Sequence, residues 1–129
     1  MKKKRRSNVP RPRNLGTMTE AAYWGKIRSA LRKTFAFWRP SAAVYDRMKV
    51  PYVGDNKRKR FMWKCEICGV LLERKDVKKD HIFPCGPLKC EADLLLFLRL
   101  LTSEDPADFQ GLCGECHQDK TNNERRARQ

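Results

Sequence analysis

The chain begins with a helical pattern of apolar side chains. Between residues 19 and 38, large apolar residues recur at every third or fourth position, which places them on one face of a helix. They are Trp24, Ile27, Leu31, Phe35 and Trp38. Thr19 is a suitable N-cap for this helix, and Pro40 is expected to end it.

Shorter elements are predicted after Pro40. Ser41 can cap a second helix over residues 42–49, which Pro51 closes. Residues 54–60 are polar and basic, which is typical of a linker. The pattern beyond Phe61 predicts strands at 70–72, 77–83 and 109–112, a helix at 91–101, and a final helix from Cys113 to about Arg125.

These elements predict an α+β protein with four segments. Residues 1–17 are expected to form a disordered basic arm, because they hold many lysines and arginines together with Pro10 and Pro12. Residues 18–53 are expected to form a helical unit for packing or DNA binding, and 54–60 a basic linker. Residues 61–126 then form the main module, preceded by the basic amphipathic helices.

The amino-acid composition suggests that this module needs a disulfide or a bound metal ion to be stable. The chain has 129 residues, a hydrophobic fraction of 40% and a mean hydropathy of −0.75. A small domain with so few apolar residues often depends on a disulfide or a metal ion. The six cysteines can supply either.

The net charge of the chain indicates which kind of partner it binds. The formal net charge is +14, which favours a polyanion such as nucleic acid. No membrane partner is expected, because the most apolar run, Leu94–Leu101, has eight residues and contains Arg99. The basic N-terminus is not followed by the apolar stretch of a signal peptide. We therefore expect a cytoplasmic protein, where paired cysteines more often bind metal than form disulfides.

Four of the cysteines form two closely spaced pairs. Cys65 and Cys68 are separated by two residues, as are Cys113 and Cys116, and 44 residues lie between the pairs. Two such turns supply the four thiolates of a tetrahedral Zn²⁺ site, which would be structural because no position stays open. The alternatives are two unrelated turns or redox dithiols.

Further candidate chemistry lies inside and beside this loop. Asp80 and His81 fall on a predicted strand, and His117 directly follows the last paired cysteine. Strand alternation sends Asp80 and His81 to opposite faces. The two histidines are nevertheless the only ones in the chain, and the cysteine pairs bring both into one small module. Asp80 and His81 can instead form a carboxylate–imidazole pair without a metal.

Three signatures occur in a fixed order along the chain. They are Cys65-x-x-Cys68, then Asp80-His81-Ile82-x-Pro84, then Leu112-Cys113-x-x-Cys116-His117-x-x-Lys120-Thr121. Over residues 61–125, this set resembles the HNH endonucleases, in the zinc-binding form that is common in bacteriophages. The resemblance implies a ββα-metal fold, in which two antiparallel strands and a helix hold one divalent ion.

The resemblance also implies roles for individual residues. His81 matches the histidine that acts as general base toward the attacking water. Asp80 and His117 match the ligands of a catalytic divalent ion, Mg²⁺ or another such as Mn²⁺. Asp108 stands where the family has asparagine, and an ionised Asp accepts hydrogen bonds but cannot donate them. Asn122 and Asn123 are alternative polar contributors.

Other residues are candidates for contacts with double-stranded DNA. They are Lys57, Arg58, Lys59 and Arg60 before the module, and Lys120 on the last helix, which can equally be an ordinary solvated lysine. The basic arm can contact phosphates or simply aid solubility. Cys85 and Cys90 can bind a second metal or form a disulfide, but burial as small apolar side chains is preferred.

These observations predict a metal-dependent endonuclease that hydrolyses DNA phosphodiester bonds, by nicking or by double-strand cleavage, and that is phage-encoded. Double-strand cleavage would need a homodimer or two sequential nicks. One alternative is a non-catalytic zinc module that binds DNA. Another is a packaging accessory that recruits other phage proteins through the tryptophan-bearing helix.

Overall fold

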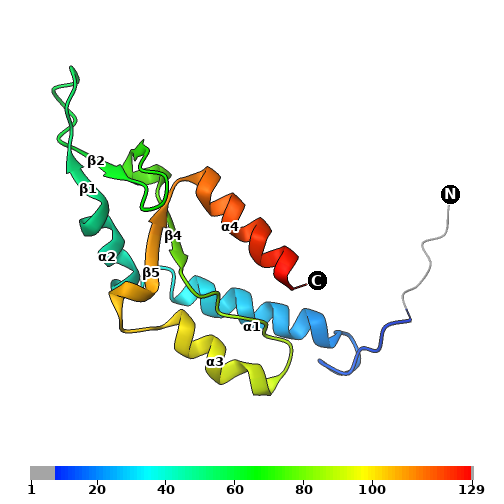
Figure 1. Cartoon of the computed structure of the whole chain (residues 1–129). Coiled ribbons are helices and arrows are strands. Elements are labelled where there is room, and N and C mark those ends of the chain that lie inside the picture. The colour runs from blue at the N-terminus through cyan, green and yellow to red at the C-terminus, as the bar shows by residue number, and fades with distance from the viewer. Residues whose placement is uncertain (1–7, 129) are drawn as a thin grey trace. The chain divides into compact units, whose positions relative to one another are not determined.

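The computed structural model describes residues 8–128. Within these residues, the chain has four α-helices and two small β-sheets, so the predicted α+β class is confirmed. The chain divides into two compact units, each built from two separate stretches (Figure 1). Unit 1 comprises the N-terminal stretch through Ala36 and residues Cys85–Leu101; unit 2 comprises Phe37–Pro84 and the stretch from Thr102 onward.

Unit 1 is a pair of helices, α1 (Glu20–Thr34) and α3 (Glu91–Leu101). The predicted cap is present, because the Thr19 hydroxyl oxygen accepts a hydrogen bond from the backbone N–H of Ala22 at 3.1 Å. The two helices share one apolar core. Its buried members are Trp24, Cys85, Leu88, Phe97 and Leu101.

The first helix ends earlier than predicted. α1 stops at Thr34, and Trp38 instead precedes α2 (Arg39–Met48) as its N-cap. Pro40 lies in the first turn of α2, where a missing backbone N–H costs nothing, rather than at the end of a helix. Ser41 is therefore not the cap; its hydroxyl donates to the Trp38 carbonyl at 2.6 Å.

The N-terminal arm is more ordered than predicted at its end. The backbones of Arg13 and Met18 pair and close a tight turn. Asn14, Leu15 and Gly16 have positive φ angles of 53°, 54° and 81°, as such a reversal requires. The basic residues Lys2 to Arg6 lie outside the described residues.

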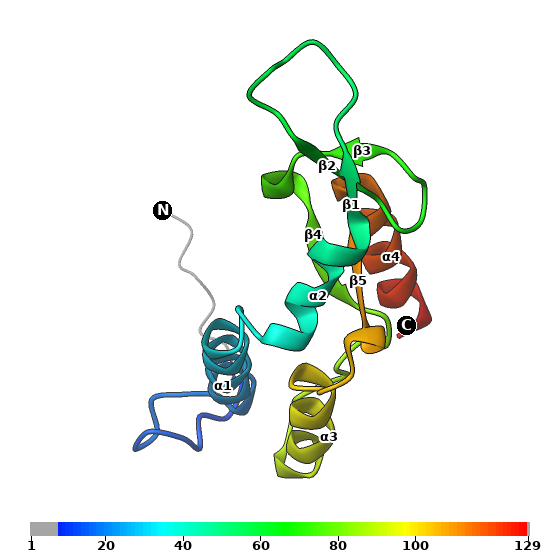
Figure 2. The same ribbon diagram turned by 90° about the vertical axis from the view of Figure 1, so that its left-hand side faces the viewer.

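Unit 2 contains a three-stranded antiparallel sheet. β1 (Lys49–Pro51) pairs with β2 (Phe61–Lys64), which also pairs with β3 (Leu71–Leu72). The basic segment 54–60 is thus not a linker between folded parts; it lies in the loop of the β1–β2 hairpin. Figure 2 shows this loop projecting beyond the strands of its own unit.

The second sheet of unit 2 carries the candidate site. β4 (Lys78–His81) pairs with β5 (Phe109–Leu112), and α4 (Gly114–Ala127) follows β5 and contacts both strands. α2 packs on the same sheet. The bounds predicted for α3 and β5 are those observed, whereas the strand predicted over 77–83 is limited to β4. Among the helices within residues 8–128, none has the length and apolar character that crossing a bilayer requires.

Candidate metal centre and neighbouring polar site

The four paired cysteines converge on one point. Cys65 and Cys68 lie on the turn after β2, while Cys113 caps α4 and Cys116 lies in its first turn. Their four sulfur atoms all lie within 4.8 Å of one another, and none of the six cysteines is in a disulfide. Four sulfurs at this spacing are the ligand set of a structural zinc site. The predicted cluster is confirmed as a group that can hold a metal ion such as zinc.

The ionisation of the sulfurs shows why a cation fits here. Burial opposes ionisation of Cys65, but hydrogen bonds from the backbone N–H groups of Cys113, Cys68 and Ile67 outweigh it and lower the pKa of Cys65 to about 6. The neighbouring sulfur of Cys113, together with burial, raises the pKa of Cys116 to about 12. One thiolate forms readily, whereas the later ones repel it. A bound cation removes that repulsion.

Side chains that the sequence did not single out tie the first cysteine turn to β5. The Glu66 carboxylate accepts a hydrogen bond from the Gly111 N–H at 2.8 Å, and the Glu66 N–H donates to the Gly111 carbonyl at 3.1 Å. Arg47 of α2 donates to the same carboxylate at 3.1 Å and to the Phe109 carbonyl at 2.6 Å. These bonds hold the first cysteine turn against the strand that leads into α4.

A second polar group includes His117, the residue that directly follows Cys116 on α4. The Asp80 carboxylate from β4 and the His117 imidazole from α4 approach to 3.9 Å between Oδ1 and Nε2. Gln110 of β5, directly opposite Asp80 in the register, donates to the other carboxylate oxygen at 3.1 Å. The Asp80 side chain is 17% exposed and that of His117 40% exposed. The structure therefore brings Asp80 and His117 together at a solvent-accessible point.

Lys120 lies at the centre of this group. Its ammonium nitrogen is 2.9 Å from Asp80 Oδ2, donates to the His81 carbonyl at 2.9 Å, and also pairs with Glu124. Partial burial disfavours the charge, but the hydrogen bonds to Glu124 and Asp80 outweigh burial and raise the pKa of Lys120. Lys120 is thus a charged partner of Asp80 rather than a solvated surface lysine.

His81 lies beside this group along the strand. It is the last residue of β4 and is paired with Phe109, and the two rings have centroids 4.9 Å apart at an interplanar angle of 56°. The Asp80 carboxylate meets His117 and Lys120 of α4, whereas the His81 ring lies against Phe109. The backbone carbonyl of His81 nevertheless reaches the polar group through Lys120.

Asp108 anchors the segment that follows His81. Its backbone carbonyl accepts the Ile82 N–H at 2.9 Å, and its carboxylate accepts the Ser103 hydroxyl at 2.5 Å. The Ser103 carbonyl in turn accepts the Trp38 indole N–H at 2.8 Å. These bonds use Asp108 only as an acceptor, a role that an ionised carboxylate performs as well as an asparagine oxygen.

The remaining candidates are dispersed. Lys57 to Arg60 lie at the β1–β2 hairpin tip. On α4, the Asn122 side-chain oxygen accepts from Gln118 at 3.0 Å, and Asn123 is exposed. Cys85 is buried in the unit 1 core, which agrees with the apolar interpretation, whereas Cys90 is exposed.

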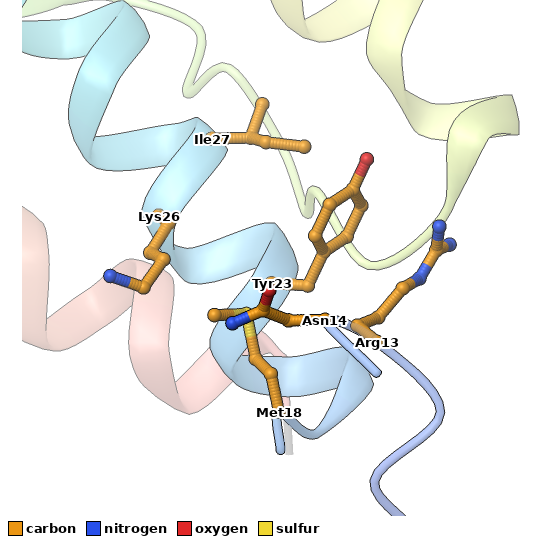
Figure 3. A pocket seen from close by; sticks show the side chains of 6 residues that line it. All are labelled: Arg13, Asn14, Met18, Tyr23, Lys26 and Ile27. Carbon is orange, nitrogen blue, oxygen red and sulfur yellow. The ribbon is translucent and has the colours of Figure 1, made fainter. Parts of the chain in front are cut away.

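A shallow pocket of about 590 Å³ is found in unit 1 (Figure 3). It is lined by Arg13, Asn14, Met18, Tyr23, Lys26 and Ile27. The Arg13 guanidinium lies over the Tyr23 ring at 4.1 Å and donates to the Glu20 carboxylate at 2.6 Å. Arg13 is therefore committed to contacts within the chain.

Comparison of the chain with protein-family models, with curated proteins and with solved structures finds no match. The geometry of the two neighbouring sites is therefore the basis on which a function is proposed.

Proposed function

We propose that this chain is a metal-dependent endonuclease of the HNH type that hydrolyses phosphodiester bonds in DNA. The observation that carries the proposal is the 3.9 Å approach of the Asp80 carboxylate and the His117 imidazole. They project from a strand and a helix of one ββα arrangement, β4–β5–α4, whose helix starts at the cysteine cluster. These two side chains and the β4–β5–α4 arrangement support the resemblance to HNH endonucleases.

The polar group fits a divalent ion such as Mg²⁺ or Mn²⁺. Asp80 and His117 offer an oxygen and a nitrogen ligand, and two protein ligands leave coordination positions for phosphate and water. When bound, the ion supplies neutralisation of the negative charge that develops on the phosphate. Lys120 and Gln110 both contact Asp80 Oδ2, which leaves Oδ1, the oxygen that approaches His117, for the ion.

His81 acts as the general base in this proposal. Its imidazole takes a proton from a water molecule, and the water oxygen forms a bond to phosphorus. The bond between phosphorus and the 3′ oxygen breaks, and that oxygen takes a proton from solvent. The products carry a 5′-phosphate and a 3′-hydroxyl.

The cysteine cluster has a different role. Four thiolates occupy all four coordination positions of a tetrahedral zinc ion and leave none for substrate. The ion would join the turn after β2 to the start of α4. It would thereby fix where His117 and Lys120 lie, without entering the reaction.

Cleavage of supercoiled plasmid tests the proposal. The purified protein is incubated with Mg²⁺, with Mn²⁺ or without an added divalent ion, beside the variants His81→Ala and His117→Ala. We expect metal-dependent nicking by the parent protein and a loss of at least a hundredfold in each variant. All variants should retain zinc. Intact plasmid under every condition, or full activity in His81→Ala, would reject the proposal.

One observation favours a second candidate, a non-catalytic zinc module that binds DNA. The Asp80 carboxylate already has Lys120 at 2.9 Å and Gln110 at 3.1 Å as partners, so it is satisfied without a metal. This candidate predicts that DNA binding persists in His117→Ala and that added Mg²⁺ or Mn²⁺ produces no nicks.

A further inference from the structure

We propose that the β1–β2 hairpin is an element for binding double-stranded DNA, with its tip entering the major groove. The proposal rests on the proposed function only in taking DNA as the ligand. The surface is separate from the Asp80–His117 group and consists of the exposed basic residues Lys57, Arg58 and Arg60 and the exposed loop residue Val53.

The hairpin is a regular two-stranded ribbon. Its register pairs Lys49 with Trp63 and Pro51 with Phe61. The Tyr52 N–H donates to the Arg60 carbonyl at 2.9 Å, which extends the ladder one residue beyond β1. The tip is therefore carried at a defined place on a pair of strands.

A tight turn orders the tip itself. The Lys59 N–H donates to the Asn56 carbonyl at 3.1 Å, and the Arg58 N–H donates to the Asn56 side-chain oxygen at 3.0 Å. This is the pattern of a β-turn stabilised by an asparagine at its first position. Lys57 and Arg58 are its two central residues, and both side chains are exposed.

The basic residues of the hairpin loop differ in whether an acidic residue balances their charge. Lys59 pairs with Glu73 at 2.7 Å, so its charge is balanced within the unit. Among the described residues, no carboxylate lies within ion-pair distance of Lys57, Arg58 or Arg60. Three exposed, unbalanced cations on one ribbon are available for contacts with the phosphate backbone.

The shape of the hairpin distinguishes among nucleic acids. The major groove of B-form DNA, about 12 Å wide, admits a two-stranded ribbon, whereas the deep, narrow major groove of RNA duplexes does not. Single-strand binding relies on exposed aromatic faces. Here the Lys49 ammonium lies over the Phe61 ring at 3.9 Å and Lys59 over the Tyr52 ring at 5.8 Å. The exposed apolar residue of the hairpin loop is Val53, which is 94% exposed and aliphatic.

Equilibrium binding to a fluorescent 20-base-pair DNA tests the proposal. All variants carry His81→Ala, and no divalent ion is added, so binding is measured without cleavage. The test variant replaces Lys57, Arg58 and Arg60 with alanine. The matched control replaces Lys26, Lys33 and Arg99, three exposed basic residues of unit 1, and thus removes the same charge.

We expect the hairpin variant to bind at least tenfold more weakly than its parent, and at least threefold more weakly than the control. The slope of log affinity against log salt should fall by about 2–3 for three lost phosphate contacts. A single change, Val53→Asp, should weaken duplex binding at least threefold without altering the melting temperature.

Three results would overturn the proposal. They are binding by the hairpin variant within twofold of the parent, a loss equal to that of the control, and parental binding to single-stranded DNA or duplex RNA of the same length as tight as to duplex DNA. Equal zinc content and melting temperature in both triple variants show that any loss arises from the surface. Because cleavage plays no part, failure of the nuclease proposal leaves this test intact.

Discussion

Among individual residues, the paired cysteines show most directly how local chemistry sets structure. Their sulfurs lie within 4.8 Å of one another, and the thiol of Cys65 has its pKa lowered to about 6. Without a cation, successive thiolates repel, as the pKa of about 12 for Cys116 indicates. The cluster therefore gains most from an ion that accepts all four sulfurs.

Replacement of one ligand should remove the ion. We expect Cys68→Ser to lose stoichiometric zinc and to lower the melting temperature by at least 5 °C, because three sulfurs bind zinc more weakly than four. Cys90→Ser is the matched control, since Cys90 is exposed and outside the cluster. Zinc content by mass spectrometry of the native protein and thermal melting give the answer. Retention of one zinc ion by Cys68→Ser would contradict the assignment.

Lys120 leads to a second prediction at this scale. Its ammonium is 2.9 Å from Asp80 Oδ2, so it competes with any cation for that carboxylate. Lys120→Ala should tighten Mn²⁺ binding at least fivefold, since a like charge at about 4 Å costs about 1 kcal/mol even in bulk water. Titration calorimetry measures the affinity. Lys78→Ala removes an exposed lysine from the same strand and should leave the affinity unchanged; an unchanged affinity in Lys120→Ala would show that Asp80 is not a metal ligand.

At the scale of elements, β5 is the strand of unit 2 that several other elements contact. α2, β4 and α4 all contact it, and the Glu66 turn bonds to its Gly111. A β-carbon at Gly111 would lie 1.9 Å from the Met48 sulfur, and Met48 is 2% exposed. The close approach of α2 to β5 therefore requires glycine at this position.

This contact can be tested by a double-mutant cycle. Gly111→Ala should lower the free energy of unfolding by about 1–3 kcal/mol, because Met48 is enclosed and must shift. Met48→Ala alone should also destabilise by creating a cavity. The double variant should be more stable than the sum of the two effects predicts, since each change accommodates the other. Strict additivity in urea denaturation would contradict the steric argument.

Prediction from sequence succeeded for elements whose ends are marked by local chemistry. Thr19 caps α1 as expected, and α3 and β5 have the predicted bounds. It failed at the end of α1 because the apolar spacing continues through the break. Trp38 keeps the helical interval, yet it packs against the Val44 cluster of unit 2 rather than in the unit 1 core. Spacing alone does not reveal which core a side chain joins.

Only some residues of the polar site were predicted from the sequence. Asp80, His117 and the four cysteines were found from motif spacing, and the structure brings Asp80 and His117 to 3.9 Å. Gln110, Ser103 and Glu124 were missed, because their contributions arise from strand register and helix packing. The β1–β2 hairpin was missed as well, since a three-residue strand ending in Pro51 carries almost no periodic signal.

At the scale of the whole molecule, the cysteine cluster closes a long loop of the chain. It joins positions separated by 44 residues, and that loop contains the stretch Cys85–Leu101, which belongs to unit 1. Closing such a loop removes conformational freedom from the unfolded chain. Metal binding should therefore contribute to the stability of the fold and not only to the local turn.

Removal of zinc should show this dependence. With a strong chelator, we expect the melting temperature to fall by at least 10 °C and to recover when Zn²⁺ is restored. Mg²⁺ should not restore it, because thiolates are poor ligands for that ion. Circular dichroism during heating provides the measurement. An identical melting curve with and without chelator, on protein shown to be metal-free, would contradict the structural role.

The interleaving of the two units also governs the order in which the chain can fold while the ribosome makes it. α1 buries Trp24 against residues that include Phe97 and Leu101, which are added some 65 positions after Ala36. At about 5–20 residues per second, this delay is roughly 3–13 s. During that time the apolar face of α1 lacks Phe97 and Leu101 as partners. Near the exit tunnel, α1 is therefore exposed to chaperones before its partner helix exists. The helix pair can form only after α3 has been synthesised.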